Sequence, residues 1–405
     1  MAAADITSLP YHPFDSTIWD NPFPTFKRLR DEHPAYYLEE FNCWFISRFE
    51  DIWKLETDQR NFDSKPGTTT THLLTRQTPS APNLTFYDGR EHNKVRSFFN
   101  PFFLPKHLKT LEANIHQFAA DALDNVIETG KADAVHDLGG YVSTRVACSL
   151  IGIPLEDADM VMDWVNGFFH RDPNVRGTSE VGMQNQKELG LYLFKLAGKA
   201  LKEGAPPNTV LEKLCSEELL GKKQDAKDIA IHTNMIVIGG TETFPKIFSG
   251  AMCRLDENPD QKERCVADAE LLPHAFHEAL RYDMPTHMLG RTVKTAFEFH
   301  GKNFEPGAGI MFLWGSANRD ERVFENPDVF DIDRRAPRIL SFGMGQHMCV
   351  GHHAAKLEGK ILLEECMKRI PDYRVNTDGI ERISSEFFRG FWKLPLEFTP
   401  GPKSK

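Results

Sequence analysis

The sequence of 405 residues lacks a long hydrophobic segment. No uninterrupted apolar run approaches the roughly 18 residues that a membrane-spanning helix needs. The first fifteen residues, MAAADITSLPYHPFD, have neither a basic start nor an apolar centre, so no export signal is visible. These absences predict a protein without a membrane anchor that works in the cytoplasm.

Paired cysteines and a basic excess are also absent. The seven cysteines are scattered and form no CxxC pair, which argues against a disulfide framework and against a zinc ribbon. A reducing cytoplasm fits this pattern. The formal net charge is −10, whereas a nucleic-acid-binding protein needs a basic face. We therefore expect no nucleic acid among the partners.

Apolar material for a core is ample, since 40% of the residues are hydrophobic. No internal repeat or low-complexity tract divides the chain. Helical periodicity predominates from Gly89 to about Ala279, with breaks expected at Pro101, Gly130, Pro154 and residues 172–177 and 204–208. A helix is also predicted in residues 21–33, a long loop in 63–83, and short strands in 35–48, 289–313 and 391–398. The sequence thus predicts one mainly α domain with a small β part, covering residues 1–405.

One cysteine stands apart, in the stretch SFGMGQHMCVGHHAAK. Cys349 precedes an amphipathic helical pattern, where the helix dipole and free N–H groups would support a thiolate, a strong metal donor. Gly343 and Gly345 allow backbone conformations that a loop pressed against a large planar ligand needs, and Phe342 could shield the sulfur. Taken alone, Cys349 would be interpreted as a small buried hydrophobe in a glycine turn.

Two other kinds of site fit this loop poorly. A dinucleotide-binding loop requires GxGxxG, but Met348 occupies the place of the third glycine, and no βαβ pattern surrounds it. A zinc site made of Cys349, His352 and His353 is disfavoured because adjacent histidines on a helix point in different directions. We expect His352 and His353 to be ordinary helix residues.

The segment FGMGQHMCVG resembles the haem-binding loop of the cytochrome P450 family, FGxGxHxCxG, at six of its ten positions. The resemblance implies that Cys349 is the thiolate ligand of a haem b iron. It also implies this family's triangular, mostly helical fold, with a small sheet and a long central helix over the haem. Further matches follow in chain order from His92 to the C-terminal RGFWKLPLEF.

A second match lies in HEALRYD, which carries Glu278 and Arg281 in the family's ExxR arrangement. The two side chains stand one helical turn apart and can form an ion pair. Arg334, in FDIDRR, matches the arginine that joins this pair. Taken alone, ExxR would be interpreted as a surface ion pair. The resemblance implies a structural role for all three residues.

Haem carries two propionates, which need cationic or hydrogen-bonding partners when they are buried. The resemblance assigns this task to His92, Arg96, Arg291 and His347. His92 and Arg96 stand at i and i+4 on a predicted helix; without the loop they would be interpreted as a solvated basic face. The prolines usual before such a histidine are replaced by Gly89 and Arg90.

The segment AIHTNMIVIGGTETFPKIFSG resembles the family's central helix and its (A/G)Gx(D/E)T motif, with Gly239 in place of the usual alanine. The Thr243 hydroxyl can bond the Gly239 carbonyl, loosening the helix and leaving a groove for dioxygen, and Pro245 adds to the irregularity. The resemblance implies that Thr243 and Glu242 are catalytic and deliver protons to bound dioxygen. The alternative is a polar patch interrupting a core helix.

A hydrophobic substrate pocket is expected by analogy with the family. It would draw on residues 64–83, 166–182, 284–289 and 387–390 and on the central helix. The candidate lining residues are apolar or aromatic: Val237, Met288, Leu289, Phe387, Phe388, Phe168 and Phe169. Any one of these phenylalanines could instead fill the core.

The resemblance predicts a monooxygenase that inserts one atom of dioxygen into a hydrophobic small molecule and reduces the other to water. No flavin or iron–sulfur module is visible, so the electrons would come from NAD(P)H through a separate ferredoxin and ferredoxin reductase, docking near Lys356 and Lys360. One alternative is a peroxide-driven peroxygenase, a class that typically lacks the acid–alcohol pair. Another is a non-catalytic haem-thiolate binding or sensor protein.

Overall fold

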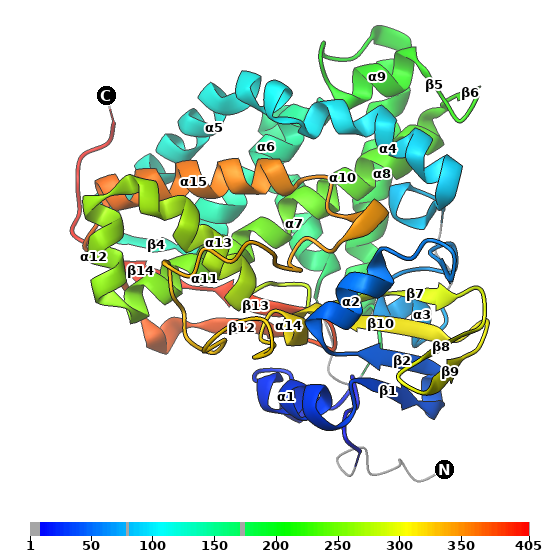
Figure 1. Cartoon of the computed structure of the whole chain (residues 1–405). Coiled ribbons are helices and arrows are strands. Elements are labelled where there is room, and N and C mark those ends of the chain that lie inside the picture. The colour runs from blue at the N-terminus through cyan, green and yellow to red at the C-terminus, as the bar shows by residue number, and fades with distance from the viewer. Residues whose placement is uncertain (1–8, 78–80, 171–174, 405) are drawn as a thin grey trace.

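The computed structural model describes residues 9–77, 81–170 and 175–404. Helices form the larger part of the molecule, and the largest sheet lies at one corner of a roughly triangular outline (Figure 1). The prediction of a mainly α protein with a small β part is therefore confirmed. None of the described helices is long and apolar enough to cross a lipid bilayer.

The helices cover most of the chain between residues 89 and 282 and return after the cysteine loop. Their bounds are α1 Phe23–Glu32, α2 Phe49–Glu56, α3 Thr70–Leu73, α4 Gly89–Phe103, α5 Pro105–Val126, α6 Tyr141–Ile151, α7 Ala158–Phe168, α8 Glu180–Glu203, α9 Val210–Ser216, α10 Ala226–Thr241, α11 Thr243–Glu257, α12 Pro259–Ala267, α13 Leu272–Tyr282, α14 Trp314–Ala317 and α15 His352–Arg369. A π-helical segment, Ala134–Gly140, precedes α6.

The strands are short. Their bounds are β1 Ala35–Leu38, β2 Cys43–Ile46, β3 Phe62–Asp63, β4 Lys131–Asp133, β5 Glu218–Leu219, β6 Lys222–Lys223, β7 Met288–Val293, β8 Phe297–Phe299, β9 Lys302–Phe304, β10 Gly309–Leu313, β11 Arg374–Val375, β12 Glu381–Ser384, β13 Arg389–Lys393 and β14 Pro395–Glu397. The largest sheet has the order β1-β2-β10-β7-β3. Strands β12 and β13 form a separate antiparallel hairpin near the C-terminus.

Most predicted helix breaks lie between helices, but two local predictions were wrong. Pro101 does not end α4, which continues to Phe103. The missing N–H of this proline costs one hydrogen bond in the last turn, where the helix is about to end anyway. The segment expected to be a long loop contains α3, which the Thr69 hydroxyl caps by accepting the His72 N–H. Residues 78–80 of that loop lie outside the described residues.

The core has one large helical cluster and two smaller clusters at the sheet. The large cluster joins α4 to α15 and includes Phe99, Leu123, Phe248, Phe276 and Leu362. The two faces of the sheet each carry one of the smaller clusters. Helix α15 packs on α5 and α13, and α10 packs on α6 and α8. This packing fixes the cysteine loop, which leads into α15, relative to the central helices α10 and α11.

Candidate active site

The central helix is broken at the predicted place. Helix α10 ends at Thr241 and α11 begins at Thr243. Pro245 has no N–H to offer the carbonyl four residues before it, and the Ser143 hydroxyl donates to that Thr241 carbonyl instead, at 3.4 Å. The Thr243 hydroxyl donates to the Gly239 carbonyl at 3.2 Å. Side-chain hydroxyls thus donate to backbone carbonyls near the break, at Gly239 and at Thr241.

Two glycines open one face of this helix. Gly239 and Gly240 are exposed, although buried residues precede and follow them. A Cβ atom at Gly239 would meet nothing within 4 Å. The backbone beside the break is therefore accessible to a flat group lying against it.

Glu242, between the two helices, is fully buried and lies against a lysine that the sequence analysis did not single out. The Glu242 Oε1 atom is 3.0 Å from the Nζ atom of Lys246, which is itself 2% exposed. The Lys246 ammonium also lies over the Trp392 ring, 5.3 Å from its centroid. The i,i+4 spacing of Glu242 and Lys246 is a signal that could have predicted this contact.

The buried ion pair of Glu242 and Lys246 should contribute to the stability of the fold. We expect Lys246→Met to lower the free energy of unfolding by about 3 to 5 kcal/mol, because it leaves the Glu242 carboxylate buried without this cation. The double variant Glu242→Gln/Lys246→Met should recover much of the loss. Urea unfolding of the purified protein measures both. Equal stability of the single and double variants would contradict the ion pair's role.

The cysteine loop is held by its glycines. Gly343 and Gly345 have φ of +64° and +73°, in the left-handed region that favours glycine. A Cβ atom at Gly345 would come within 2.6 Å of the Glu56 carbonyl oxygen. The Cys349 N–H donates to the Phe342 carbonyl at 2.8 Å, which closes the loop. Gly345 therefore cannot be replaced without moving the loop, and a side chain at Gly343 would be strained by its positive φ.

Cys349 is exposed on this loop. The protein atoms around it nevertheless partly exclude water from the thiol, and this burial raises its pKa. The N–H groups of Gly351 and His352 and the charge of Arg96 act in the opposite direction on that pKa. Arg96 is anchored to the same loop, because its Nη1 donates to the Gln346 carbonyl at 3.2 Å and to the Met348 carbonyl at 2.6 Å. The pKa of the Cys349 thiol is raised overall, because burial outweighs the three groups that favour the thiolate.

His92 and His347 lie together near the loop. Their ring centroids are 4.4 Å apart. His92 is buried, and neither of its ring nitrogens has a hydrogen-bond partner among the described residues. Burial, with help from His347 and Arg96, lowers the pKa of His92 to about 4. A buried imidazole with both nitrogens unpaired calls for a polar ligand group.

Arg291, on β7, completes the set of four expected propionate partners. Its pKa is lowered by burial, and Glu56 and Asp88 oppose that effect. Its charge in turn contributes to the lowered pKa of His347. The structure therefore brings Arg291 within electrostatic range of His347, while Arg96 and His92 approach from α4.

Two acids in this region were missed by the sequence analysis. Asp88 Oδ1 lies 3.3 Å from His347 Nε2. Although burial alone would raise its pKa, hydrogen bonds from His347, Asp63 and the Ser64 N–H hold the Asp88 pKa well below its usual range. Burial raises the pKa of Glu56 to about 8, against the opposing effect of Arg291. These acids come from segments far apart in sequence, so no local pattern indicated them.

The chemistry of these residues fits a haem. Cys349 is exposed on a loop that a hydrogen bond closes, His92 offers unpaired nitrogens, and Gly239 offers an open backbone face. Phe342 is half-buried beside the loop. A soft thiolate, cations for carboxylates and a flat accessible surface are the features that haem requires.

Glu278, Arg281 and Arg334 form one buried network. Arg281 donates to both carboxylate oxygens of Glu278, at 2.6 and 2.9 Å, and Arg334 Nε donates to Glu278 Oε1 at 3.1 Å. Arg281 also donates to the Asn318 and Pro327 carbonyls. The network ties α13 to the segment before the cysteine loop, in agreement with a structural role.

The candidate pocket residues are not all brought together. Met288, Phe387 and Phe388 share one hydrophobic cluster, whereas Val237 belongs to the large helical core. Leu289 packs against the opposite face of the sheet, because neighbouring residues of a strand point to opposite faces. The Phe169 ring lies 5.4 Å from that of Phe388 and 5.0 Å from that of Phe168. Residues 171–174 of the expected pocket lie outside the described residues.

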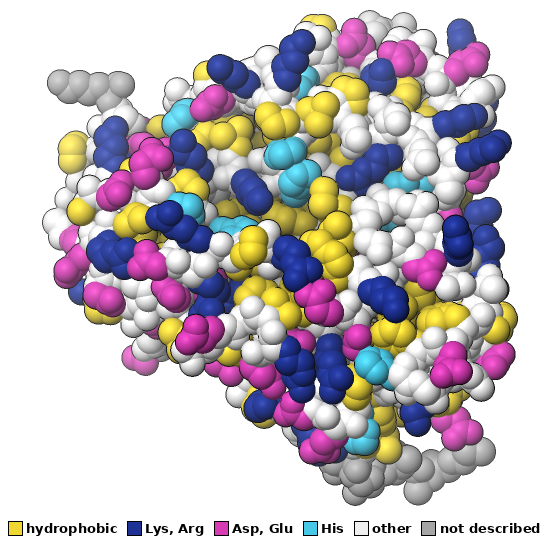
Figure 2. Space-filling view, viewed as in Figure 1, with side chains coloured by type: hydrophobic (Ala, Val, Ile, Leu, Met, Phe, Trp, Pro, Cys, Tyr) yellow, Lys and Arg dark blue, Asp and Glu magenta, His cyan; other side chains and the backbone are white. Residues whose placement is uncertain are grey.

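Helix α15 carries the lysines expected to meet a redox partner. Lys356 lies over the Phe342 ring at 5.9 Å, and Lys360 pairs with Glu364 at 3.7 Å. On the face seen in Figure 2, basic and histidine side chains are interspersed with acidic ones. His352 Nδ1 lies 2.9 Å from the Cys349 carbonyl oxygen, and its ring is tilted by 38° against that of His353, with the centroids 3.9 Å apart. The described residues contain no cluster of His, Cys, Asp and Glu that could hold a metal ion.

Comparisons with known proteins agree with this geometry. The family model for cytochrome P450 matches residues 199–371. Putative cytochrome P450 123 of Mycobacterium tuberculosis is 30% identical over 386 residues, covering 95% of this chain and 96% of the relative. The steroid C26-monooxygenase of the same species is 31% identical over 332 residues, covering 80% and 88%. The solved structure of the Bacillus subtilis bacillaene polyketide synthase cytochrome P450 PksS aligns with a TM-score of 0.84 and 27% identity, covering 96% and 100%.

Proposed function

Since this chain belongs to the cytochrome P450 family and is a monooxygenase, we propose that it oxidises a hydrophobic small molecule with electrons from NAD(P)H. A separate ferredoxin and ferredoxin reductase would deliver the electrons. The balanced reaction takes a C–H bond, one dioxygen, two electrons and two protons, and gives one C–OH group and one water. The whole chain would act as a single haem-thiolate domain.

The observation that supports this proposal is the exposed Cys349 sulfur on a loop closed by hydrogen bonds, together with a broken central helix that carries an acid and an alcohol. A thiolate-ligated haem supplies electron density that favours cleavage of the O–O bond. In this proposal Cys349 holds the iron, while His92, Arg96, Arg291 and His347 hold the propionates. Gly239 leaves room beside the helix.

The acid and the alcohol have different tasks in the proposal. The Thr243 hydroxyl, bonded to the Gly239 carbonyl, keeps its oxygen at the helix break and passes a proton across it. Glu242 holds the next proton at its carboxylate. Both protons that the reaction consumes would travel this way.

A hydrophobic substrate is supported by the aromatic cluster at the C-terminal hairpin. Met288, Phe387 and Phe388 pack together with Phe169 beside them. An absorbance titration of the purified protein against terpenoids, steroids, fatty acids and aromatic compounds tests this proposal. NADH consumption dependent on both a bound compound and a supplied ferredoxin system would support the monooxygenase. Turnover with hydrogen peroxide alone would indicate a peroxygenase. If the protein turned over neither with the ferredoxin system nor with hydrogen peroxide, it would be a binding or sensor protein.

The alcohol gives a prediction of its own. We expect Thr243→Ala to lower the product formed per NADH by about tenfold or more, because a positioned proton donor contributes at least that much. The electrons would appear as hydrogen peroxide. Thr243→Ser, which keeps the hydroxyl, should retain most of the coupling. Unchanged coupling in the alanine variant would show that Thr243 does not deliver protons.

A further inference from the structure

A pocket of about 500 Å³ lies at the start of α1. Its other walls come from α11, from the end of α13, from the segment after α14 and from the start of β13; in Figure 1, α1 lies below the hairpin of β12 and β13. The lining residues are Asn21, Phe23, Pro24, Lys27, Arg254, Tyr282, Arg319, Asp328 and Arg389. None of these belongs to the candidate active site. The volume lies in the range of small-molecule sites, about 300 to 1,000 Å³.

Cations dominate the walls of this pocket. Asp328 is the one acid among the lining residues, against three arginines and Lys27. Lys27 is exposed and pairs with Asp31 and Glu321, which do not line the pocket, whereas the arginines are more buried. In a chain with a formal net charge of −10, such a group of cations runs against the average charge. It favours a negatively charged ligand.

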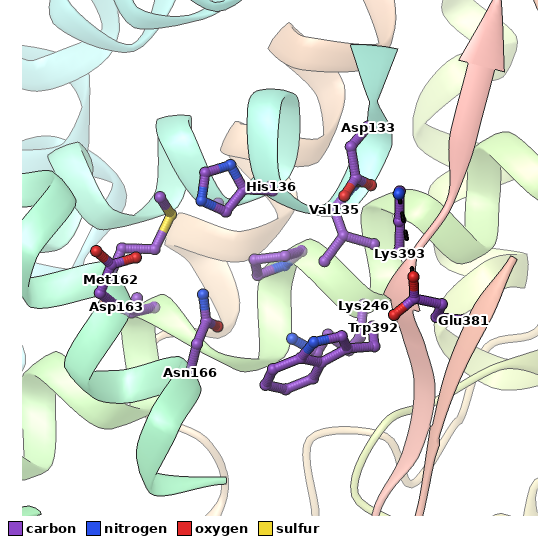
Figure 3. Close-up of a pocket in the computed structure, with 13 residues that line it drawn as sticks. Asp133, Val135, His136, Met162, Asp163, Asn166, Lys246, Glu381, Trp392 and Lys393 are labelled. Carbon is purple, nitrogen blue, oxygen red and sulfur yellow. Dashed lines mark hydrogen bonds and ion pairs between the residues drawn. The ribbon is translucent and has the colours of Figure 1, made fainter. Parts of the chain in front are cut away.

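The cavity behind Lys246 has a different character. It measures about 320 Å³ and lies between the π-helical segment, α7, the α10–α11 junction and the hairpin of β12 and β13. Figure 3 shows charged groups of both signs on its walls: Asp133, Asp163, Glu381, Lys246 and Lys393. Such a mixture selects neither cations nor anions, whereas the pocket at α1 selects anions.

Two aromatic rings hold the three guanidinium groups of the pocket in place. The Cζ atom of Arg319 lies 3.6 Å from the centroid of the Tyr282 ring and 4.1 Å from that of the Phe23 ring. Arg254 lies over the same Tyr282 ring at 5.0 Å, and Arg389 lies over the Phe23 ring at 5.4 Å. Guanidinium groups on aromatic faces keep their charge and lose little freedom when they bind a further group.

One buried carboxylate is shared by two of the arginines. Asp283 accepts hydrogen bonds from Arg254, at 2.5 and 3.1 Å, and from Arg389 at 3.3 Å. Although burial alone would raise it, the charges of Arg254, Arg389 and Arg319 hold the pKa of Asp283 at about 2. Arg254 also donates to Glu257, so it contributes mainly its charge to the pocket. The positive charge of this group thus exceeds that of the carboxylate it surrounds.

Arg319 and Arg389 have donors left for a ligand. Arg319 is 4% exposed, and its Nη1 and Nη2 donate to Asp328 and to the Tyr282 carbonyl. Its Nε has no hydrogen-bond partner among the described residues. The hydrogen bonds of Arg389 within these residues use its Nε and Nη1, which leaves Nη2. Since buried N–H groups normally have an acceptor, this pocket calls for one that the protein does not supply.

We propose that this pocket is a second ligand site, separate from the haem, and that it binds the phosphate group of a small organic molecule. The guanidinium fork matches the oxygen geometry of a phosphate. A phosphate monoester carries a charge of about −1.5 to −2 at neutral pH, which suits several arginines better than the single charge of a carboxylate. The volume of the pocket leaves room for the organic part beside the phosphate.

Isothermal titration calorimetry of the resting, haem-loaded protein tests this proposal. The probes are inorganic phosphate and adenosine monophosphate, with acetate as the carboxylate probe. Both phosphate probes should bind saturably and compete with each other, and added sodium chloride should weaken their binding. Acetate should bind at least tenfold more weakly. No saturable heat with either phosphate probe, or an equal affinity for acetate, overturns the proposal.

Variants locate the bound phosphate. Arg389→Gln should weaken phosphate affinity about tenfold or more, because it removes a charged donor, and Arg389→Lys should recover part of the loss. The matched control is Arg264→Gln, since Arg264 pairs with Asp333 and does not line the pocket. It should leave the affinity unchanged.

A second pair of variants avoids the ion pairs that support the fold. Asn21 is exposed and lines the pocket. Asn21→Glu adds a negative charge there and should weaken phosphate affinity several-fold, whereas Asn21→Gln should leave it unchanged. If Arg389→Gln does not fold, this pair still decides the question.

The absorbance spectrum distinguishes this site from the haem. Phosphate bound in the pocket at α1 should leave the Soret band unchanged. A Soret shift on adding phosphate, with the same affinity in the wild-type protein and in Asn21→Glu, would place the anion at the iron and overturn the proposal. Equal phosphate affinity in Arg389→Gln and Arg264→Gln would also overturn it. The titration needs no turnover, so its result stands whether or not the protein oxidises any compound.

Discussion

Replacing Cys349 by serine should reduce turnover below detection while the protein still folds. A serine hydroxyl stays protonated under conditions in which a thiol is readily ionised, so the variant lacks the anionic sulfur that this haem chemistry needs. Burial raises the pKa of the Cys349 thiol, and two N–H groups and the Arg96 charge act against that effect. NADH-dependent product formation with a supplied redox system measures the effect.

A matched cysteine variant controls for the loss of a thiol in general. Cys215, on α9, is half-buried and away from the cysteine loop. Cys215→Ser should leave both turnover and the absorbance spectrum unchanged. If Cys349→Ser kept turnover comparable with that of Cys215→Ser, Cys349 would not be the ligand.

The second large effect is expected at Arg281. Its side chain is fully buried, and Glu278 and three backbone carbonyls accept its hydrogen bonds. Arg281→Met should cost about 3 to 5 kcal/mol of unfolding free energy, because it leaves a buried carboxylate with one cation fewer and frees several carbonyls. Since total stabilities are typically about 5 to 15 kcal/mol, little folded protein should accumulate.

Urea unfolding and the yield of haem-loaded protein measure this loss. The control is Arg264→Met, which breaks an exposed pair with Asp333. That variant should leave the unfolding midpoint nearly unchanged, because solvent screens exposed pairs. Equal midpoints for the two variants would show that burial of the Glu278 network contributes nothing to stability.

The fold class was predictable because helical and strand periodicity are local properties of the sequence. The strand pair β1 and β2 follows from aromatic and β-branched residues on both sides of a short turn. The errors at Pro101 and in the loop that contains α3 concern helix ends, where one proline or one capping hydroxyl decides the outcome. Alternation along β7 is equally local and separates Met288 from Leu289, whereas the sequence analysis had expected both to line one pocket.

Residues of the candidate site were predictable where they occur in contiguous motifs. Hydrogen bonds close the loop at Cys349, connect Thr243 with Gly239 and connect Glu278 with Arg334. The catalytic roles of the site residues remain proposals. Glu56 and Asp88 were missed because their contacts with Arg291 and His347 are made between distant segments. The cavity behind Lys246 was missed for the same reason, since four separate segments enclose it.

In the proposed function, Cys349 binds the haem iron as a thiolate. The absorbance spectrum of the reduced, carbon monoxide-bound protein tests it most directly, because the position of the Soret band reports the ligand opposite carbon monoxide. We expect a strongly red-shifted Soret band in the wild-type protein and its loss in Cys349→His. A wild-type spectrum without that shift, or a Cys349→His variant that keeps it, would show that Cys349 is not the thiolate ligand.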